Sequence, residues 1–321
     1  MPLPSGWSQR LQLPLVTAPM FLVSSVDLVV AACRRGVLGS FPTGNARTVE
    51  MLEQWLRDIS TALTPQDAPW AVNLVVHRSY ERLEQDLALV EQYRPPLVIT
   101  ALGSPRHVID RVHGYGGLVF ADVNSLKHAR QAAALGVDGL VLVAAGAGGH
   151  TGQMGAFAMV PGIREFFDGT LVLGGGLCDG AGIRAAEVLG ADLASMGTRF
   201  IACEETLASD GYRQMLVDSS IEDLILTASV SGVPAYWLRK SLTAAGFDID
   251  AIERGVRMES TSPSNYGRWT QIWSAGHGVG SIKAVESVAA VLQRLTAEYW
   301  QAVDRAPAVR RVSTPMQRVA A

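Results

Sequence analysis

The stretch LGVDGLVLVA, residues 135–144, decides the fold, because its pattern returns as LGADLASMG at residues 189–197. In both copies Leu-Gly-x-Asp ends a helical pattern and an apolar run follows, as expected where a helix ends and a buried strand begins. Similar runs recur along the first two thirds of the chain. They are continuous rather than alternating, which is typical of strands buried on both faces of a parallel sheet. The eight runs are residues 13–18, 36–41, 71–76, 97–101, 117–121, 139–144, 170–173 and 193–196.

Helical patterns separate these runs. In residues 80–93, Leu83, Leu87 and Val90 share one face of a helix that must stop before Pro95. Eight strand–helix units favour a closed (β/α)8 barrel over an open doubly wound sheet, which usually has fewer strands. The sequence therefore predicts the α/β class and a TIM barrel with an additional helical lobe.

The chain is expected to divide into three parts. The barrel takes residues 1–200. Strand-like runs then become rare, so we expect a helical lobe or insertion at the barrel mouth over residues 201–280. Residues 281–321 begin with a long helical pattern that is expected to pack on the barrel, and they end in a frayed tail.

Composition narrows the class of protein. With 48% hydrophobic and 18% charged residues among 321, the chain can bury a large core. Its formal net charge of −3 gives no general attraction to nucleic acid or to an acidic membrane surface, and no apolar run is long enough for a membrane span. Cys33, Cys178 and Cys203 lie far apart, without the spacing of metal ligands. These features predict a cytoplasmic protein without a metal site.

Two glycine-rich loops follow the seventh and eighth apolar runs. In LVLGGGLCDG, residues 171–180, three glycines would let backbone amides approach a phosphate, and the helix that follows would add its partial positive charge. Together with MGTRF, residues 196–200, they match the phosphate site that many barrels form from their last two loops. The alternative is that the glycines only make a tight turn. Cys178, inside this turn, is interpreted as structural.

A single histidine lies in the loop after the sixth run. His150 is surrounded by Gly146, Gly148, Gly149 and Gly152, so a flat ligand could approach the backbone while the imidazole lies above it. An imidazole exchanges a proton near neutral pH, as a general base must. No second histidine or carboxylate stands beside it at a metal-ligand interval. The loop therefore predicts acid–base chemistry on a planar ligand.

Taken together, these segments resemble the nitronate monooxygenase family of FMN-dependent barrel enzymes. The resemblance is carried by AGGHTG, GGGLCDG and LGADLASMGTRF, and further by TAPM, VNLVVHRS and IWSAGHGVGSI. It covers most of residues 13–295. It implies a flavoprotein oxidoreductase that oxidises alkyl nitronates, and also nitroalkanes, with dioxygen.

The resemblance also implies residue roles. His150 would be the catalytic base that takes the α-proton of a substrate held over flavin N5, and Asn73 would hydrogen-bond the flavin. Gly174, Gly175 and Gly176, with Gly197 and Thr198, would hold the phosphate. The remaining residues that would line the FMN are Ala18, Pro19, Met20, Ala145, Gly148, Gly149 and Met196.

Three further residues are candidates for the substrate pocket: Asp122, Ser274 and His277. The family commonly has Gly-Gln-Gly where this chain reads Gly276-His277-Gly278. His277 could change substrate choice, add a second titrating group, or simply pack on the surface. Asp122 ends the fifth run and faces the mouth in the expected register, where a carboxylate would disfavour a strongly anionic substrate.

Other functions stay open at this point. The same scaffold resembles FMN-dependent enoyl-thioester reductases and quinone reductases, which take electrons from NAD(P)H. A non-enzymatic FMN-binding sensor is a third alternative, against which the acid–base histidine argues. The expected partners are a small-molecule substrate and dioxygen or another electron acceptor, with no nucleic acid and no membrane; a homodimer is left open.

Overall fold

An eight-stranded parallel sheet forms the centre of the computed structural model, which describes residues 3–254 and 272–305. The strand order is β1-β9-β8-β6-β5-β4-β3-β2, and a bridge between Val16 and Leu38 joins its two ends. All eight apolar runs form strands of this closed barrel, which confirms the predicted (β/α)8 fold. The strands are β1 Leu15–Thr17, β2 Gly39–Pro42, β3 Trp70–Val75, β4 Leu97–Ala101, β5 Leu118–Val123, β6 Gly139–Val143, β8 Thr170–Gly174 and β9 Leu193–Met196.

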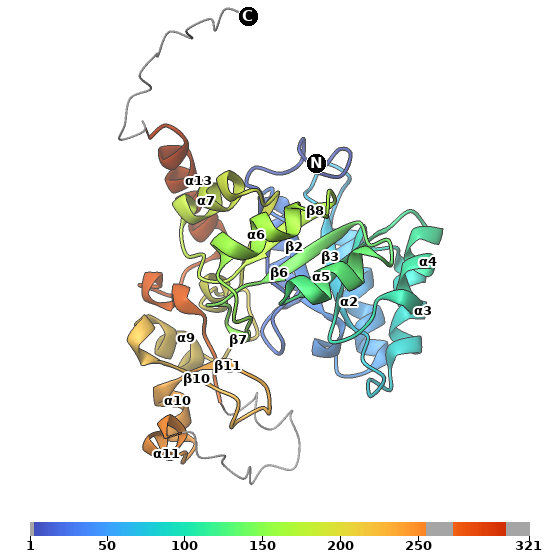
Figure 1. The fold of residues 1–321 in the computed structure, drawn as a ribbon. Coiled ribbons are helices and arrows are strands. Elements are labelled where there is room, and N and C mark those ends of the chain that lie inside the picture. The colour runs from blue at the N-terminus through green and yellow to red at the C-terminus, as the bar shows by residue number, and fades with distance from the viewer. Residues whose placement is uncertain (1–2, 255–271, 306–321) are drawn as a thin grey trace, which may run out of the picture.

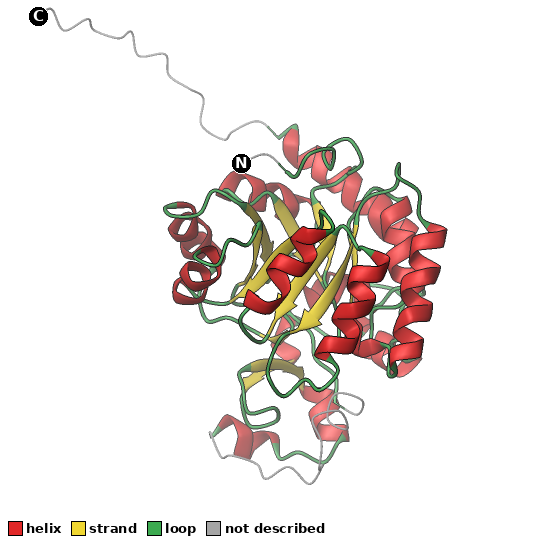
Figure 2. Cartoon of the chain, turned by 90° about the vertical axis from the view of Figure 1, so that its right-hand side faces the viewer, coloured by secondary structure: helices red, strands yellow, loops and turns green. Residues whose placement is uncertain are grey.

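Helices cover the outside of the barrel (Figures 1 and 2). The last of them, α13, packs on both α7 and α1 and so takes the place of the eighth barrel helix. Its contact with α7 is close: a Cβ added to Gly180 would lie 2.2 Å from the Tyr299 nitrogen, so glycine is required there. The barrel helices are α1 Val26–Arg34, α2 Val49–Ala62, α3 Leu83–Tyr93, α4 Arg106–Gly114, α5 Leu126–Ala133, α6 Ala156–Arg164, α7 Gly180–Leu189 and α13 Val288–Val303.

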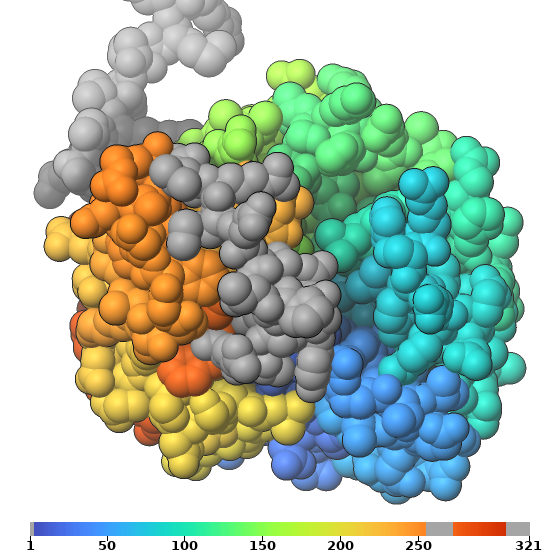
Figure 3. All heavy atoms as spheres, turned by 90° about the horizontal axis from the view of Figure 1, so that it is seen from below, coloured from blue at the N-terminus to red at the C-terminus, as the bar shows by residue number. Residues whose placement is uncertain are grey.

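Between β9 and α13 the chain leaves the barrel and forms a lobe at its carboxyl-terminal end, the mouth (Figure 1). Viewed from that end, the lobe covers one side of the barrel (Figure 3). Its elements are the short helices α8 Thr198–Ile201, α9 Asp210–Val217, α10 Arg239–Ala244 and α11 Ile249–Glu253, the 3-10 turns Ile221–Asp223 and His277–Ser281, and the strands β10 Leu224–Thr227 and β11 Ala235–Leu238.

The lobe differs from the expected helical one because it contains a second sheet. β10 and β11 pair antiparallel, and β11 also pairs with β7, Gly149–His150, from the loop after β6. In this pairing Ala235 lies opposite His150 and Tyr236 lies opposite Gly149. The sheet therefore ties the lobe to the glycine-rich loop of the barrel.

Side chains inside the barrel form layers. A barrel of this type shifts by about one residue per strand, so alternate strands contribute inward side chains to one layer. The strand pairings place four apolar residues, Val16, Ala71, Phe120 and Val172, in one such layer. Two residues further along the same strands lies the layer nearest the mouth, called the mouth layer below: Ala18, Asn73, Asp122 and Gly174.

The opposite end of the barrel is closed. Trp7, from the segment before β1, is buried and packs on Phe120 with ring centroids 6.2 Å apart. Of the helices in residues 3–254 and 272–305, none combines the length and apolar character that crossing a membrane requires.

Candidate functional site

Three barrel loops and one C-terminal segment meet at the mouth. The His277 N–H donates to the Gly146 carbonyl at 3.0 Å, and the Gly176 N–H donates to the same oxygen at 3.2 Å. The Gly276 N–H donates to the Thr198 hydroxyl at 2.8 Å. The segment 274–278 thus joins the loops after β6 and β9, and the loop after β8 bonds directly to the loop after β6, as the motifs quoted above require if they form one site.

Several glycines of the site are needed by the fold itself. A Cβ on Gly148 would lie 2.7 Å from the Gly276 nitrogen, and one on Gly276 would lie 2.6 Å from the Gly146 oxygen. Gly175 has φ +123°, and a Cβ there would lie 2.8 Å from the Ala144 carbonyl. At these positions the tight-turn interpretation explains the glycine without a ligand.

Gly176 differs from these positions. It has φ +70°, it is exposed, and apart from its two chain neighbours no atom of the described residues lies within 4 Å of an added Cβ. The loop after β8 therefore turns an open, side-chain-free surface outward at this residue, and an anionic group could approach the backbone there.

The amino terminus of α7, beside this loop, differs from the expectation that it helps to bind a phosphate. At the start of α7, the Gly180 N–H donates to the Glu298 carboxylate at 2.9 Å and the Gly182 N–H donates to Asp179 at 2.7 Å. These two amides are occupied, so neither of them is a free donor for a phosphate. In α8, by contrast, the N–H groups of Thr198 and Arg199 have no acceptor among the described residues.

The TAPM segment lies against the loop after β9. The Ala18 N–H donates to the carbonyl of Met196, itself buried, at 2.9 Å. A Cβ on Gly197 would lie 3.5 Å from both the Ala18 Cβ and the Met20 sulfur, an ordinary contact distance. Pro19 lies between them and is half-buried. The sequence-based grouping of these two segments is consistent with this geometry.

Two polar side chains share the mouth layer. The Asn73 amide nitrogen donates to the Ile99 carbonyl at 3.2 Å, and its oxygen has no partner among the described residues. Asp122 forms no hydrogen bond or ion pair in that part of the chain, and burial raises its pKa to about 7. The other two members are small: Ala18 carries only a methyl group and Gly174 has no side chain.

His150 is fixed at the rim by the second sheet. It pairs with Ala235, and the next residue, Thr151, donates its N–H to the Pro234 carbonyl at 3.2 Å. The residue is exposed at the surface, but the protein atoms around the imidazole lower its pKa below the usual value. A neutral imidazole, the form that accepts a proton, therefore prevails at neutral pH.

His277 is not a simple surface residue. Its ring contacts Tyr236 edge to face, with centroids 4.6 Å apart, and burial lowers its pKa. Tyr236 is a residue of the site that the sequence did not single out.

Ser274 takes part through its backbone, because its carbonyl accepts a hydrogen bond from the Tyr212 hydroxyl at 2.5 Å. Ala145 likewise contributes its backbone, donating its N–H to Met154 at 2.8 Å.

Two other features do not form part of the site. Burial is the main cause that raises the pKa of the Cys178 thiol, which fits its structural interpretation.

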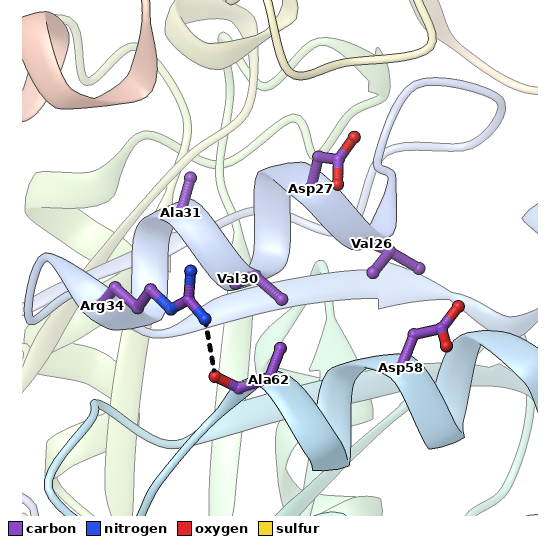
Figure 4. A pocket seen from close by; sticks show the side chains of 7 residues that line it. All are labelled: Val26, Asp27, Val30, Ala31, Arg34, Asp58 and Ala62. Carbon is purple, nitrogen blue, oxygen red and sulfur yellow. Dashed lines mark hydrogen bonds between the residues drawn. The ribbon is translucent and has the colours of Figure 1, made fainter.

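A groove between α1 and α2 lies on the outside of the barrel (Figure 4). Asp27, Arg34 and Asp58 are exposed there, and Arg34 donates to the Ala62 carbonyl. Within the described residues, no group of three histidine, cysteine or carboxylate side chains could hold a metal ion.

With this geometry in hand, comparison with known proteins identifies the family. The model of the nitronate monooxygenase family matches residues 79–298. The chain belongs to the nitronate monooxygenase family. Members of this family are flavin-dependent enzymes, so this chain is an oxidoreductase with a small-molecule substrate.

Two relatives carry the name of this family, and a third is named as a dehydrogenase. A nitronate monooxygenase of Paraburkholderia phytofirmans is 31% identical, over 73% of this chain and 76% of the relative. One of Pseudomonas aeruginosa is 29% identical, over 69% of this chain and 75% of the relative. A 5-hydroxy-7a-methyl-1-oxo-octahydro-1H-indene-4-carboxyl-CoA dehydrogenase of Mycobacterium tuberculosis is 27% identical, over 76% of this chain and 66% of that enzyme.

Solved structures share the fold. FabK of Thermotoga maritima and a nitroalkane oxidase of Streptomyces ansochromogenes each superpose with a TM-score of 0.76 at 23% identity. Both matches cover 91% of this chain, with 94% of FabK and 96% of the oxidase.

Proposed function

We propose that this chain is an FMN-dependent nitronate monooxygenase that oxidises alkyl nitronates, and also neutral nitroalkanes, with dioxygen as the electron acceptor. The observation that carries the proposal is the position of His150. The β7–β11 pairing holds a largely neutral imidazole at the rim of a mouth whose inner layer includes the small residues Ala18 and Gly174.

The residues of the mouth fit FMN. Ala18 and Gly174 would place no bulky side chain against the isoalloxazine, and the Asn73 oxygen is available to accept a hydrogen bond from it. The amides of Thr198 and Arg199 would donate to the phosphate, and the side-chain-free surface at Gly176, whose own N–H is bonded to Gly146, would let it approach. The sequence has no fingerprint for an adenylate half, which favours FMN over FAD. When bound, FMN supplies the electron transfer and the oxygen chemistry.

The protein's own contribution is proton transfer and positioning. A neutral nitroalkane must lose its α-proton before it can be oxidised, and neutral His150 can accept that proton. A preformed nitronate has already lost it, so for that substrate the imidazole only positions the anion. The glycines around His150 keep bulky side chains away from the reacting carbon.

Anaerobic reduction of the bound flavin tests the proposal. The purified protein is mixed in a stopped-flow instrument with propane-2-nitronate, 2-nitropropane, NADH or NADPH. We expect rapid bleaching by the nitronate, slower bleaching by the nitroalkane, and none within the same time by the nucleotides. Rapid bleaching by NADH together with none by either nitro compound would replace this function with that of a reductase.

A further inference from the structure

Asp122 has no part in the function proposed above, although it lies in the same layer as Asn73. It stands two residues after Phe120 on β5, so its side chain points into the barrel like that ring. Its partner across the β5–β6 pairing is Val141, which is buried and apolar. The carboxyl thus lies between an apolar core and the space where a ligand would be held.

No cation compensates this carboxyl within the described residues. Asp122 forms no ion pair there, and burial is the one cause that raises its pKa to about 7. The loop between β4 and α4 carries no charged side chain. In the described loops that follow the other strands at this end, the titratable or charged side chains are Arg47, His77, Arg78, Tyr80, Glu81, Arg82, Lys127, His128, His150, Cys178, Asp179 and Arg199, and the lobe adds Tyr236 and His277. None of them is a cause of the shift in the pKa of Asp122.

We propose that Asp122 takes up a proton when an anionic substrate binds, and that its neutral carboxyl then donates a hydrogen bond to an oxygen of the nitronate. The identity of this substrate rests on the proposed function. The proton comes from solvent, and no bond of the substrate breaks in this step. An ionised Asp122 would repel the anion, whereas a carboxylic acid offers a donor to it.

This inference reverses the expectation drawn from the sequence, in which a carboxylate excludes anions from the mouth. Below a pH of about 7, Asp122 is already neutral and an anion binds without proton uptake. Above it, each unit of pH should weaken anion binding by up to about tenfold, because one proton must be taken up. A neutral nitroalkane should not show this dependence.

Calorimetry on the flavin-loaded protein tests the proposal with nitrite, an anion whose two oxygens sit on nitrogen as in a nitronate. Titrations at pH 8.5 in two buffers of different ionisation enthalpy report the protons taken up. We expect close to one proton for the wild type and an affinity that falls toward tenfold per pH unit. Asp122→Asn keeps a donor but cannot titrate, so uptake should vanish and the affinity should become independent of pH. Asp110→Asn, an exposed change on α4, is the matched control and should behave as wild type.

Nitrite that binds to the wild type without proton uptake, equal uptake in Asp122→Asn, or no binding at pH 6 would each overturn the inference. A second measurement needs no ligand. The raised pKa means that wild type loses stability as pH rises from about 3.8 through about 7, and Asp122→Asn should not. The melting temperature of the wild type minus that of Asp122→Asn should therefore fall as pH rises over this range. A difference that stays constant would also overturn the inference. If nitronates fail as substrates while nitrite keeps its Asp122-dependent uptake, the proposed function falls and this inference stands.

Discussion

The two ends of the barrel are built from the same strands and do opposite things. Toward the amino-terminal end, Phe120 and its layer are apolar, buried and covered by Trp7. At the mouth the same strands present Asn73 and Asp122 with unpartnered oxygens, among the described residues, beside the small Ala18 and Gly174. Burial of apolar surface stabilises the first end by about 25 cal/mol per Å². The mouth lacks this stabilisation, as expected of a site that a ligand completes.

The largest expected effect is a loss of stability from a change at the closed end of the barrel. Phe120→Ala removes a fully buried ring from the middle of the barrel and should lower the free energy of unfolding by about 3–5 kcal/mol. Flavin affinity at a temperature where the variant stays folded should be unchanged, because the ring lies below the mouth layer. Urea unfolding and flavin titration check the two halves of this statement. A parallel loss of flavin affinity would mean that the two ends are not separable.

The next effect belongs to the mouth. His150→Asn should reduce turnover of a neutral nitroalkane by roughly a hundredfold or more, the scale for loss of a general base, and turnover of the nitronate much less. Flavin content should stay near normal. Because the pKa of His150 is lowered, the neutral base persists as pH falls, and the acid limb of kcat/KM for the nitroalkane should lie below pH 6.5. Equal losses for both substrates would remove the base role from His150.

A smaller effect tests the phosphate. Asn and Asp both tolerate the positive φ of Gly176, so Gly176→Asn and Gly176→Asp differ mainly in charge. If the loop receives the FMN phosphate, the Asp variant should bind FMN about tenfold more weakly than the Asn variant, through a repulsion of ~1.4 kcal/mol. Riboflavin, which lacks the phosphate, is the control ligand and should not distinguish the variants. The same ratio for both ligands would favour a plain turn.

The smallest expected effect concerns the position where the family commonly has glutamine. The His277 backbone N–H, and not its imidazole, bonds the loop after β6. His277→Gln should therefore change kcat/KM for the nitronate by less than about threefold, equivalent to roughly 0.6 kcal/mol. Steady-state kinetics from pH 6 to 9 check this, and a change above tenfold would make the ring contact with Tyr236 part of substrate selection.

The sequence predicts the barrel well because continuous apolar runs report burial directly, and each of the eight runs became a strand. It also predicts which loops converge, since parallel strands end at one edge. The second sheet escapes it for a physical reason: β7 has two residues among glycines, and its partner β11 lies far along the chain. Such pairing leaves no local periodicity.

The occupied start of α7 could not be predicted either. One of its two acceptors, Glu298, is 118 residues away in sequence, whereas the N-cap residue Asp179 is local. The raised pKa of Asp122 is of the same kind, because burial depends on the strands around it and not on its neighbours in the chain. Local pattern thus predicts strands and loops, whereas the chemistry of the site depends on contacts between distant segments.

The central claim, that the open end of the barrel holds FMN, is tested most directly by identifying the cofactor. Heat-released flavin from purified protein is separated by chromatography and counted against protein. The account predicts one FMN per chain in the wild type and in Phe120→Ala, and a depleted Gly176→Asp. A colourless protein that cannot be reconstituted with FMN, or the release of FAD, would contradict it.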